Sequence, residues 1–235
     1  MIAPPDTFLP RAESLGLAFE PGDLDRIARY LDLLLQANER FNLTAITDPS
    51  QAWTRHILDS LTLAPLIASA DAKNVIDVGS GGGLPGIPLA ITLRDVRFTL
   101  LEATGKKARF LEETIAELGL SNARVINDRA ETIGQDHHLY REQYDIVLAR
   151  AVGRLPVLLE LTVPLARVGG LVLAMKGVQA RQEIEEAKQA LHLLHAHVID
   201  VRDADTGVVV VIEKQRKTAR VYPRAPGDPK RAPLH

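Results

Sequence analysis

The stretch Val75-Ile76-Asp77-Val78-Gly79-Ser80-Gly81-Gly82-Gly83-Leu84-Pro85-Gly86 decides the fold of this chain. Its first four residues form a short apolar run that predicts a strand, and five glycines follow within the next eight residues. Glycines let the backbone turn sharply and approach a ligand, because no Cβ stands in the way. The pattern therefore predicts a strand, a tight turn that faces a ligand, and then a helix.

Apolar runs and helical stretches alternate from this point to about residue 212. Further strands are predicted at 98–102, 124–127, 144–148, 171–175, 198–201 and 208–212, with helices at about 106–118 and 179–194. Such alternation is typical of an α/β fold, in which helices cover both faces of a mostly parallel sheet. The last two runs are separated only by Asp203–Gly207, which predicts an antiparallel hairpin at one edge of the sheet.

The residues before 73 contain predicted helices and no predicted strand. Apolar residues spaced three and four apart indicate an amphipathic helix over 23–41, with Asp23 as its N-cap. Ser50 is the expected N-cap of a second helix, which Pro65 bends or restarts.

Composition excludes several classes of protein. None of the 235 residues is a cysteine, so disulfides, iron–sulfur clusters, thiolate zinc sites and cysteine nucleophiles are excluded. No apolar run approaches the roughly 18 residues of a membrane span, and residues 1–6 do not begin a secretory signal. We expect a cytoplasmic protein that forms one structural unit, with a helical extension at 1–72, a sheet domain at 73–214 and a tail at 215–235.

The histidine and acidic residues do not show the spacing of a known metal-binding motif. His137-His138 is interpreted as a polar loop, since no further ligand stands at metal spacing, and no bound metal is expected. His56 and Asp59 lie one helical turn apart, close to Arg55, and we expect a surface cluster whose members satisfy one another rather than a catalytic pair.

Positive charge is concentrated at the end of the chain. The net charge is −2, but the last 22 residues hold seven basic side chains and a single acid. Four prolines in the same segment predict an extended conformation without a helix. Charge alone leaves two interpretations open, a solvated terminus or a contact with a polyanion such as RNA.

Three ligands compete for the glycine-rich turn. A nucleoside triphosphate is disfavoured because no Gly-Lys-Ser/Thr follows at the required spacing. A dinucleotide is possible, since Gly81, Gly83 and Gly86 satisfy G-x-G-x-x-G. S-adenosylmethionine fits better, because Asp77 on the strand would favour its positive amino and sulfonium groups and would repel a diphosphate. Glu102, at the end of the second strand, is placed to accept hydrogen bonds from ribose hydroxyls.

The sequence also restricts the methyl acceptor. The absence of cysteine excludes methylation of a pyrimidine carbon through a thiolate adduct. The segment after the fourth strand, Ala149-Arg150-Ala151-Val152-Gly153, lacks the Asp/Asn-Pro-Pro that holds an exocyclic amine. Lys176 and Glu213 could be half of a ribose-methylating set, but Asp145 lies at the wrong end of its strand. A ring nitrogen such as guanine N7 needs no general base, only alignment and exclusion of water.

Motifs that match one known family run through nearly the whole chain from residue 23. They are FNLTA at 41–45, HILDSL at 56–61, DVGSGGGLPG at 77–86, KK at 106–107, RAE at 129–131, ARA at 149–151, KG at 176–177, YPR at 222–224 and PL at 233–234. The chain resembles the RsmG (GidB) family of bacterial small-subunit ribosomal RNA guanine-N7 methyltransferases. The resemblance implies a class I (Rossmann-like) S-adenosylmethionine-dependent methyltransferase sheet of seven strands, with an antiparallel edge hairpin and an N-terminal helical extension.

The resemblance also implies which residues contact the cofactor, namely Gly79, Leu84, Ala130, Glu131 and Arg150. This chain has Leu84 where the family often has Phe, and Gly82 where it often has Ala. Both departures concern packing around the adenosine.

The leading hypothesis is a methyltransferase for N7 of a guanine in the helix 18 loop of 16S rRNA, a substrate that the resemblance implies. We expect a monomer that acts on 16S rRNA or the small ribosomal subunit. The residues expected to hold the donor are Asp77, Gly79, Gly81, Leu84, Glu102, Ala130, Glu131 and Arg150. Arg150 follows a buried strand at the cofactor end and is the nearest candidate for a catalytic residue, whereas the tail residues expected to contact RNA are Arg220, Arg224, Lys230 and Arg231.

Two alternatives belong to other functional classes. An NAD-dependent oxidoreductase would explain the Gly81/Gly83/Gly86 match, but Tyr140 and Tyr144 have no lysine four residues on. A non-catalytic RNA-binding module would explain the basic tail. Binding of NADH instead of S-adenosylmethionine would favour the first alternative, and methyl transfer to ribosomal RNA would exclude the second.

Overall fold

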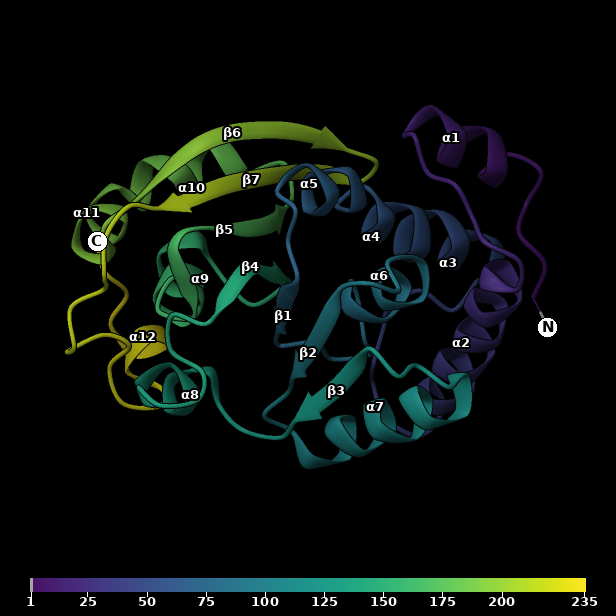
Figure 1. Cartoon of the computed structure of the whole chain (residues 1–235), viewed down its shortest axis with the longest axis horizontal. Helices are drawn as coiled ribbons and strands as arrows, with labels where there is room; N and C mark the ends of the chain where they lie inside the picture. Colours follow the sequence, from purple (N-terminus) through teal and green to yellow (C-terminus); the bar gives the residue numbers. More distant parts are fainter. Residues whose placement is uncertain (1) are drawn as a thin grey trace.

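The computed structural model describes residues 2–235. Within them, seven strands form one sheet in the order β3-β2-β1-β4-β5-β7-β6, and helices pack on both of its faces (Figure 1). The strands are β1 (Asn74–Val78), β2 (Arg97–Leu101), β3 (Ala123–Ile126), β4 (Tyr144–Arg150), β5 (Ala166–Lys176), β6 (Ala196–Ala204) and β7 (Gly207–Lys214). The predicted α/β class, with all seven strands, is confirmed.

The pairing of the strands follows the predicted pattern. Strands β1 to β5 pair in parallel, whereas β7 is antiparallel to both β5 and β6. The edge hairpin is tighter than expected, because Ala204 pairs with Gly207 and leaves only a two-residue turn. The polar residues at the end of β6 were expected to be loop, but in an edge strand their side chains point to solvent while the backbone continues the ladder.

The helices of the sheet domain are α6 (Gly86–Thr92), α7 (Gly105–Leu118), α8 (Ala130–Gln135), α9 (Leu155–Thr162), α10 (Ala180–Glu186) and α11 (Lys188–Leu194). The helix expected at about 106–118 is confirmed as α7. Gly119 closes α7 in the left-handed region, with φ of +63°. The single helix expected over 179–194 is wrong, since the buried Ala187 has a non-helical ψ of 1° and separates α10 from α11.

The extension is helical, as predicted, but both predicted N-caps are wrong. Its helices are α1 (Phe8–Ser14), α2 (Asp23–Asn38), α3 (Pro49–Ala52), the π-helix η1 (Trp53–Leu58), α4 (Asp59–Leu61) and α5 (Ala64–Ser69). Gly22 is the N-cap of α2, while the Asp23 carboxylate accepts from the Glu20 amide and pairs with Arg94. Asp48 replaces Ser50 as the second cap, because its carboxylate reaches the Gln51 amide at 2.8 Å.

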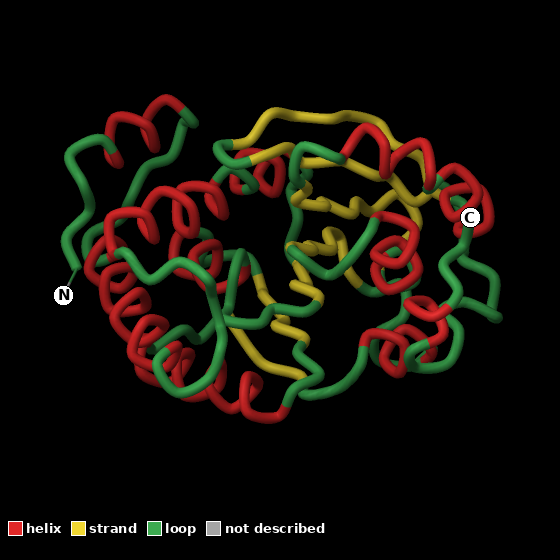
Figure 2. The backbone as a smooth tube through the Cα atoms, turned by 180° about the vertical axis from the view of Figure 1, so that it is seen from behind, coloured by secondary structure: helices red, strands yellow, loops and turns green. Residues whose placement is uncertain are grey.

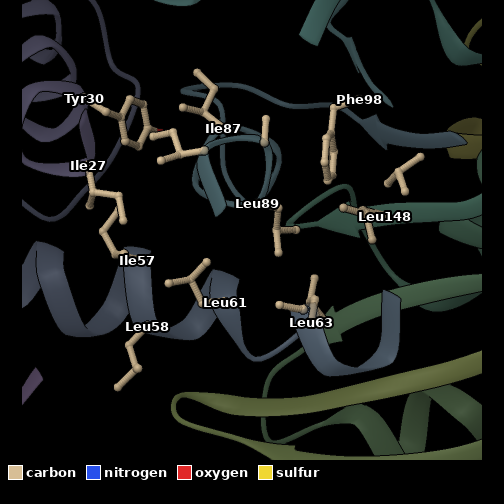
Figure 3. Packing of buried hydrophobic residues seen from close by; sticks show 14 of the residues in the cluster. Ile27, Tyr30, Ile57, Leu58, Leu61, Leu63, Ile87, Leu89, Phe98 and Leu148 are labelled. Atoms are coloured by element: carbon tan, nitrogen blue, oxygen red, sulfur yellow. The ribbon is translucent and has the colours of Figure 1, made fainter. Parts of the chain in front are cut away.

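The extension and the sheet share one hydrophobic core. Figure 3 shows apolar side chains of the extension, such as Leu61 and Leu63, directed toward those of α6 and the sheet, such as Leu89 and Leu148. A second cluster lies on the other face of the sheet, so alternate residues of each central strand enter opposite clusters. The expected boundary at residue 72 therefore does not separate two cores.

The tail is docked onto the domain, which corrects the expectation of an extended segment. Figure 2 shows it beside the helices near the C-terminus, and it contains a short helix, α12 (Asp228–Arg231). The buried Arg141 guanidinium donates to the carbonyl oxygens of Thr218 (2.8 Å) and Tyr222 (2.6 Å). Pro229 does not prevent α12, because proline is tolerated in the first turn of a helix.

Among residues 2–235, no helix has both the length and the apolar character that crossing a membrane requires.

Candidate functional site

The glycine-rich turn joins β1 to α6 at the edge of the sheet where the parallel strands end. Gly79, Gly81 and Gly83 have φ of +72°, +57° and +96°, a region that other residues adopt at a cost. The amide of Gly79 donates to the Leu101 carbonyl at 2.8 Å, which ties the turn to β2. The predicted strand, turn and helix are thus confirmed.

Asp77 supports this turn from the inside of the protein. Its side chain is only 1% exposed, and its Oδ2 accepts from the Gly86 amide at 3.1 Å. Burial raises the pKa of Asp77 to about 7, partly offset by the Gly86 and Ser80 hydrogen bonds and by the charge of Arg150. Oδ1 has no hydrogen-bond partner in the part of the chain that the structure describes.

Glu102 links the glycine-rich turn to the start of α7. Its Oε2 accepts from the Gly81 amide at 3.0 Å, and its Oε1 accepts from the Thr104 amide at 2.7 Å. Asn127, at the end of β3, donates to the Glu102 carbonyl at 2.8 Å. The structure therefore brings Gly81 and Glu102, which were both expected to hold the donor, together at the ends of neighbouring strands. The direct hydrogen bond between them was not predicted from the sequence.

A first cavity of about 220 Å³ opens beside the turn. The predicted residues Gly79, Ala130 and Glu131 line it, together with residues that end β1 and β2. The tail closes one side through Gly227, Pro229 and Lys230, and Glu131 Oε1 accepts from the Gly227 amide at 2.9 Å. Sequence reasoning missed this wall, because no local pattern relates residue 131 to residue 227.

A second cavity, of about 260 Å³, lies at the ends of β4 and β5. Its lining includes Asp59, Arg150, Ala151, Lys176, Glu183 and Thr206. Ala151 lines the second cavity and Val152 lines the first, so one short segment forms a wall between them. Ala151 has φ of +57°, a strained conformation of the kind that clusters at functional sites.

Arg150 is held in place by the extension. Its Nη2 donates to the Arg55 carbonyl of η1 at 2.8 Å and lies 3.2 Å from Asp59 Oδ2. Nη1 is buried and, within residues 2–235, has no hydrogen-bond partner. On the far side of the second cavity, Lys176 Nζ donates to the Gly153 carbonyl at 2.7 Å and pairs with Glu183 at 2.6 Å.

The expected surface cluster of His56 and Asp59 is wrong, because both side chains are buried. His56 Nε2 lies 2.6 Å from Thr44 Oγ1, and Asp59 reaches Arg150. Burial and the charge of Arg150 lower the pKa of His56 to about 4, so its ring is neutral at pH 7. The spacing of His56 and Asp59 could not reveal this, since their partners come from other segments.

The remaining predicted residues are distributed as follows. Leu84 is half-buried and packs against the core of the extension. Arg220, Lys230 and Arg231 are exposed, whereas Arg224 makes a two-pronged ion pair with the fully buried Glu160, at 2.8 and 2.6 Å. Across residues 2–235, no group of three or more histidine or acidic side chains is arranged to hold a metal ion.

Comparison with known proteins identifies relatives over nearly the whole chain. The model of the GidB family, described as rRNA small subunit methyltransferase G, matches residues 23–211. A ribosomal RNA small subunit methyltransferase G from Halalkalibacterium halodurans is 42% identical over 97% of this chain and 98% of the relative. Its counterpart from Sorangium cellulosum is 43% identical over 94% and 92%. Among solved structures, an O-methyltransferase from Bacillus cereus in complex with SAH aligns with a TM-score of 0.56 at 21% identity, over 78% of this chain and 89% of that one.

Proposed function

This chain belongs to the rRNA small subunit methyltransferase G family, and on that premise we propose that it methylates N7 of a guanine in the helix 18 loop of 16S rRNA, with S-adenosyl-L-methionine as the donor. The observation that carries the proposal is the pair of adjoining cavities at the carboxyl ends of the strands. Ligands of open α/β sheets bind at this edge. Two adjoining cavities suit a reaction in which a donor and an acceptor must meet.

The first cavity fits the donor. A Cβ on Gly79 would lie only 3.2 Å from Val152 Cγ2, so a side chain at this position would crowd the lining of the cavity. Glu102 does not itself line this cavity, but its chain neighbours Leu101 and Ala103 do, and its carboxylate is proposed to accept from ribose hydroxyls. Ala130 and Glu131, which follow β3, line the cavity. Asp77 is buried below the turn, and its Oδ1 has no hydrogen-bond partner among residues 2–235. Because burial raises its pKa to about 7, the positive charge of a bound donor would favour its ionised form. When bound, S-adenosyl-L-methionine supplies an electrophilic methyl group on a positively charged sulfur.

The chain needs no general base for this reaction. Guanine N7 carries a lone pair and no proton, so positioning of the base suffices. His56, which is buried and bonded to Thr44, keeps a neutral ring next to Arg150. Arg150 and Ala151 line the second cavity and Val152 lines the first, so this segment is placed to hold the acceptor base in line with the donor.

The exposed basic residues are proposed to contact RNA phosphates. Lys230 lines the first cavity, and Arg220 and Arg231 lie on the same docked tail. Arg224 was expected to act in the same way, but its pairing with Glu160 supports a structural role for it. The proposed partner is 16S rRNA or the small ribosomal subunit, which would place the protein in the cytoplasm.

Mapping of methyl groups on 16S rRNA tests the proposal. We expect a 7-methylguanine in the helix 18 loop of cells that contain the protein and an unmodified guanine in cells that lack it. Purified protein with S-adenosyl-L-methionine should restore the methyl group in vitro. A helix 18 that is unmodified in both strains, with no transfer in vitro, would contradict the proposal, and binding of NADH in place of the methyl donor would favour an oxidoreductase.

A further inference from the structure

We propose that Asp59 selects guanine in the second cavity, by accepting hydrogen bonds from the N1–H and the exocyclic amine of the base. This inference rests on the proposed function and deepens it, because it names the side chain that distinguishes the acceptor base from adenine. We therefore expect the preference for guanine over adenine to depend on the Asp59 carboxylate.

The second cavity is in the right place for an acceptor base. It adjoins the first cavity across the wall formed by Ala151 and Val152. Its volume of about 260 Å³ is several times the roughly 30 Å³ that a water molecule occupies in the liquid, so it can hold a nucleobase. Enzymes that modify a base commonly take it out of the stack into such a pocket.

Asp59 has unused capacity to accept hydrogen bonds. Its side chain is 4% exposed, and its Oδ2 lies 3.2 Å from Arg150 Nη2. Asp59 also lines the second cavity, so its carboxylate adjoins the space in which a base would lie. An ionised carboxylate can accept about four hydrogen bonds, and buried polar groups are normally satisfied. An N–H donor of a bound ligand would therefore find a free acceptor position on the Asp59 carboxylate.

The position of Asp59 is fixed from two sides. The preceding π-helix η1 directs the Arg55 carbonyl to Arg150 Nη2, so the guanidinium is anchored before any base binds. The positive charge of Arg150 in turn compensates the buried carboxylate of Asp59. A π-helix inside a longer helix often marks a functional site.

Base chemistry decides which purine suits this carboxylate. Guanine presents two adjacent donors, N1–H and the amine at C2, on its Watson–Crick edge. Adenine presents an unprotonated N1 there, whose lone pair would face the carboxylate oxygens. A site built to accept from such donors rejects an analogue that lacks them, because the buried acceptor is left unpaired. With this edge on Asp59, N7 lies on the other ring of the purine and remains available to the donor in the first cavity.

Nucleotide binding to the full chain, saturated with S-adenosylhomocysteine, tests the inference without methyl transfer. Chemical shift changes in NMR titrations would give the affinities for GMP, IMP, 1-methyl-GMP and AMP. We expect GMP to bind about tenfold more tightly than AMP or 1-methyl-GMP, with IMP between them because it keeps N1–H and lacks the amine. Equal affinities for GMP and 1-methyl-GMP would overturn the proposal with the wild-type protein alone.

Variants then assign the selectivity to one side chain. Asp59→Asn should bring the affinities for GMP and AMP within about threefold of each other. The matched control is Glu183→Gln, which alters a carboxylate in the same cavity that pairs with Lys176 instead and should keep the GMP preference. Persistence of that preference in Asp59→Asn would overturn the inference. Methylation of rRNA by the wild-type protein is measured separately. Absence of methyl transfer would contradict the proposed function but not the selection of guanine by Asp59.

Discussion

Tyr30, in helix α2 of the extension, donates a hydrogen bond from its hydroxyl to the carbonyl oxygen of Gly82, at 2.7 Å. The two residues are 52 positions apart, and the Tyr30 side chain is fully buried. The hydroxyl thus joins the extension to the turn that carries the first cavity. The extension contributes to the site as well as to the core.

Tyr30→Phe should loosen the turn. Loss of the hydroxyl leaves the buried Gly82 carbonyl without this donor, at a cost of about 1–3 kcal/mol in the free energy of unfolding. We expect a matching fall in the urea midpoint and weaker binding of S-adenosyl-L-methionine by calorimetry. Tyr140→Phe, on a half-buried surface tyrosine, is the control, and equal effects of both variants would contradict a role for Tyr30 in the turn.

Glu102→Gln should weaken donor binding and also loosen the turn locally, because the amide nitrogen cannot accept from the Gly81 or Thr104 amide as the carboxylate does. The amide keeps the shape of the side chain but removes the charge, and hydrogen bonds to charged groups contribute about 1.5–3 kcal/mol. We expect the Kd for S-adenosyl-L-methionine to rise at least tenfold in calorimetric titrations. Glu112→Gln, on the exposed face of α7, should leave the Kd unchanged. An unaltered Kd in Glu102→Gln would place the ribose elsewhere.

Asp77→Asn should change how stability depends on pH. Because burial raises the pKa of Asp77 to about 7, the folded protein retains this proton between about pH 4 and 7, where the unfolded chain has lost it. Asp77 therefore contributes a free energy of unfolding that falls as the pH rises over this range. The variant lacks that decline, so its stability relative to the wild type should increase from pH 4 to 7 in urea titrations. A constant difference would indicate that Asp77 is ionised throughout.

His56→Gln should change the pH dependence in the opposite sense. Burial lowers the pKa of His56 to about 4. Below pH 6.5 the ring is therefore protonated in the unfolded chain while it stays neutral in the folded protein. This residue therefore destabilises the wild type as the pH falls from 6.5 to 4, by at most about 3 kcal/mol. In thermal unfolding, the variant should therefore lose less stability than the wild type between pH 7 and pH 5. If both lose the same stability, His56 is accessible to protons in the folded state.

Arg224→Ala and Lys230→Ala should separate two roles of the tail, which are stabilisation of the fold and contact with RNA phosphates. Removal of Arg224 leaves the buried Glu160 carboxylate unpaired, which typically costs about 3–5 kcal/mol of stability. Removal of the exposed Lys230 should leave stability unchanged, and should reduce the slope of log affinity for 16S rRNA against log salt by about 0.7–0.9. Filter binding at several salt concentrations and urea unfolding measure both quantities. An unchanged slope in Lys230→Ala would show that this residue does not contact phosphate.

Local patterns were sufficient for the elements that depend on neighbours in the chain. The glycines of the turn, the closing Gly119 and the short apolar runs of β1 and β2 all act through backbone freedom or burial within a few positions. The predictions from local pattern were wrong mainly where a contact with a distant segment overrides a local preference. The proline-rich tail, for example, is folded because Arg141 and Glu160 bind it. The wrong N-cap at Ser50 has a local cause instead, since Asp48, two residues earlier, caps the helix.

The sequence by itself determined the strand–turn–helix at Asn74–Thr92, the seven strands and the acid that ends β2, because each follows from residue types over short stretches. Only the tertiary structure decided that Asp59 and His56 are buried beside Arg150, that Gly227 closes the first cavity over Glu131, and that one segment separates the two cavities. The Arg150–Arg55 and Gly227–Glu131 contacts join residues 95 and 96 positions apart. Such pairs form only when the packed core brings the segments together, and no periodicity or spacing along one chain encodes them.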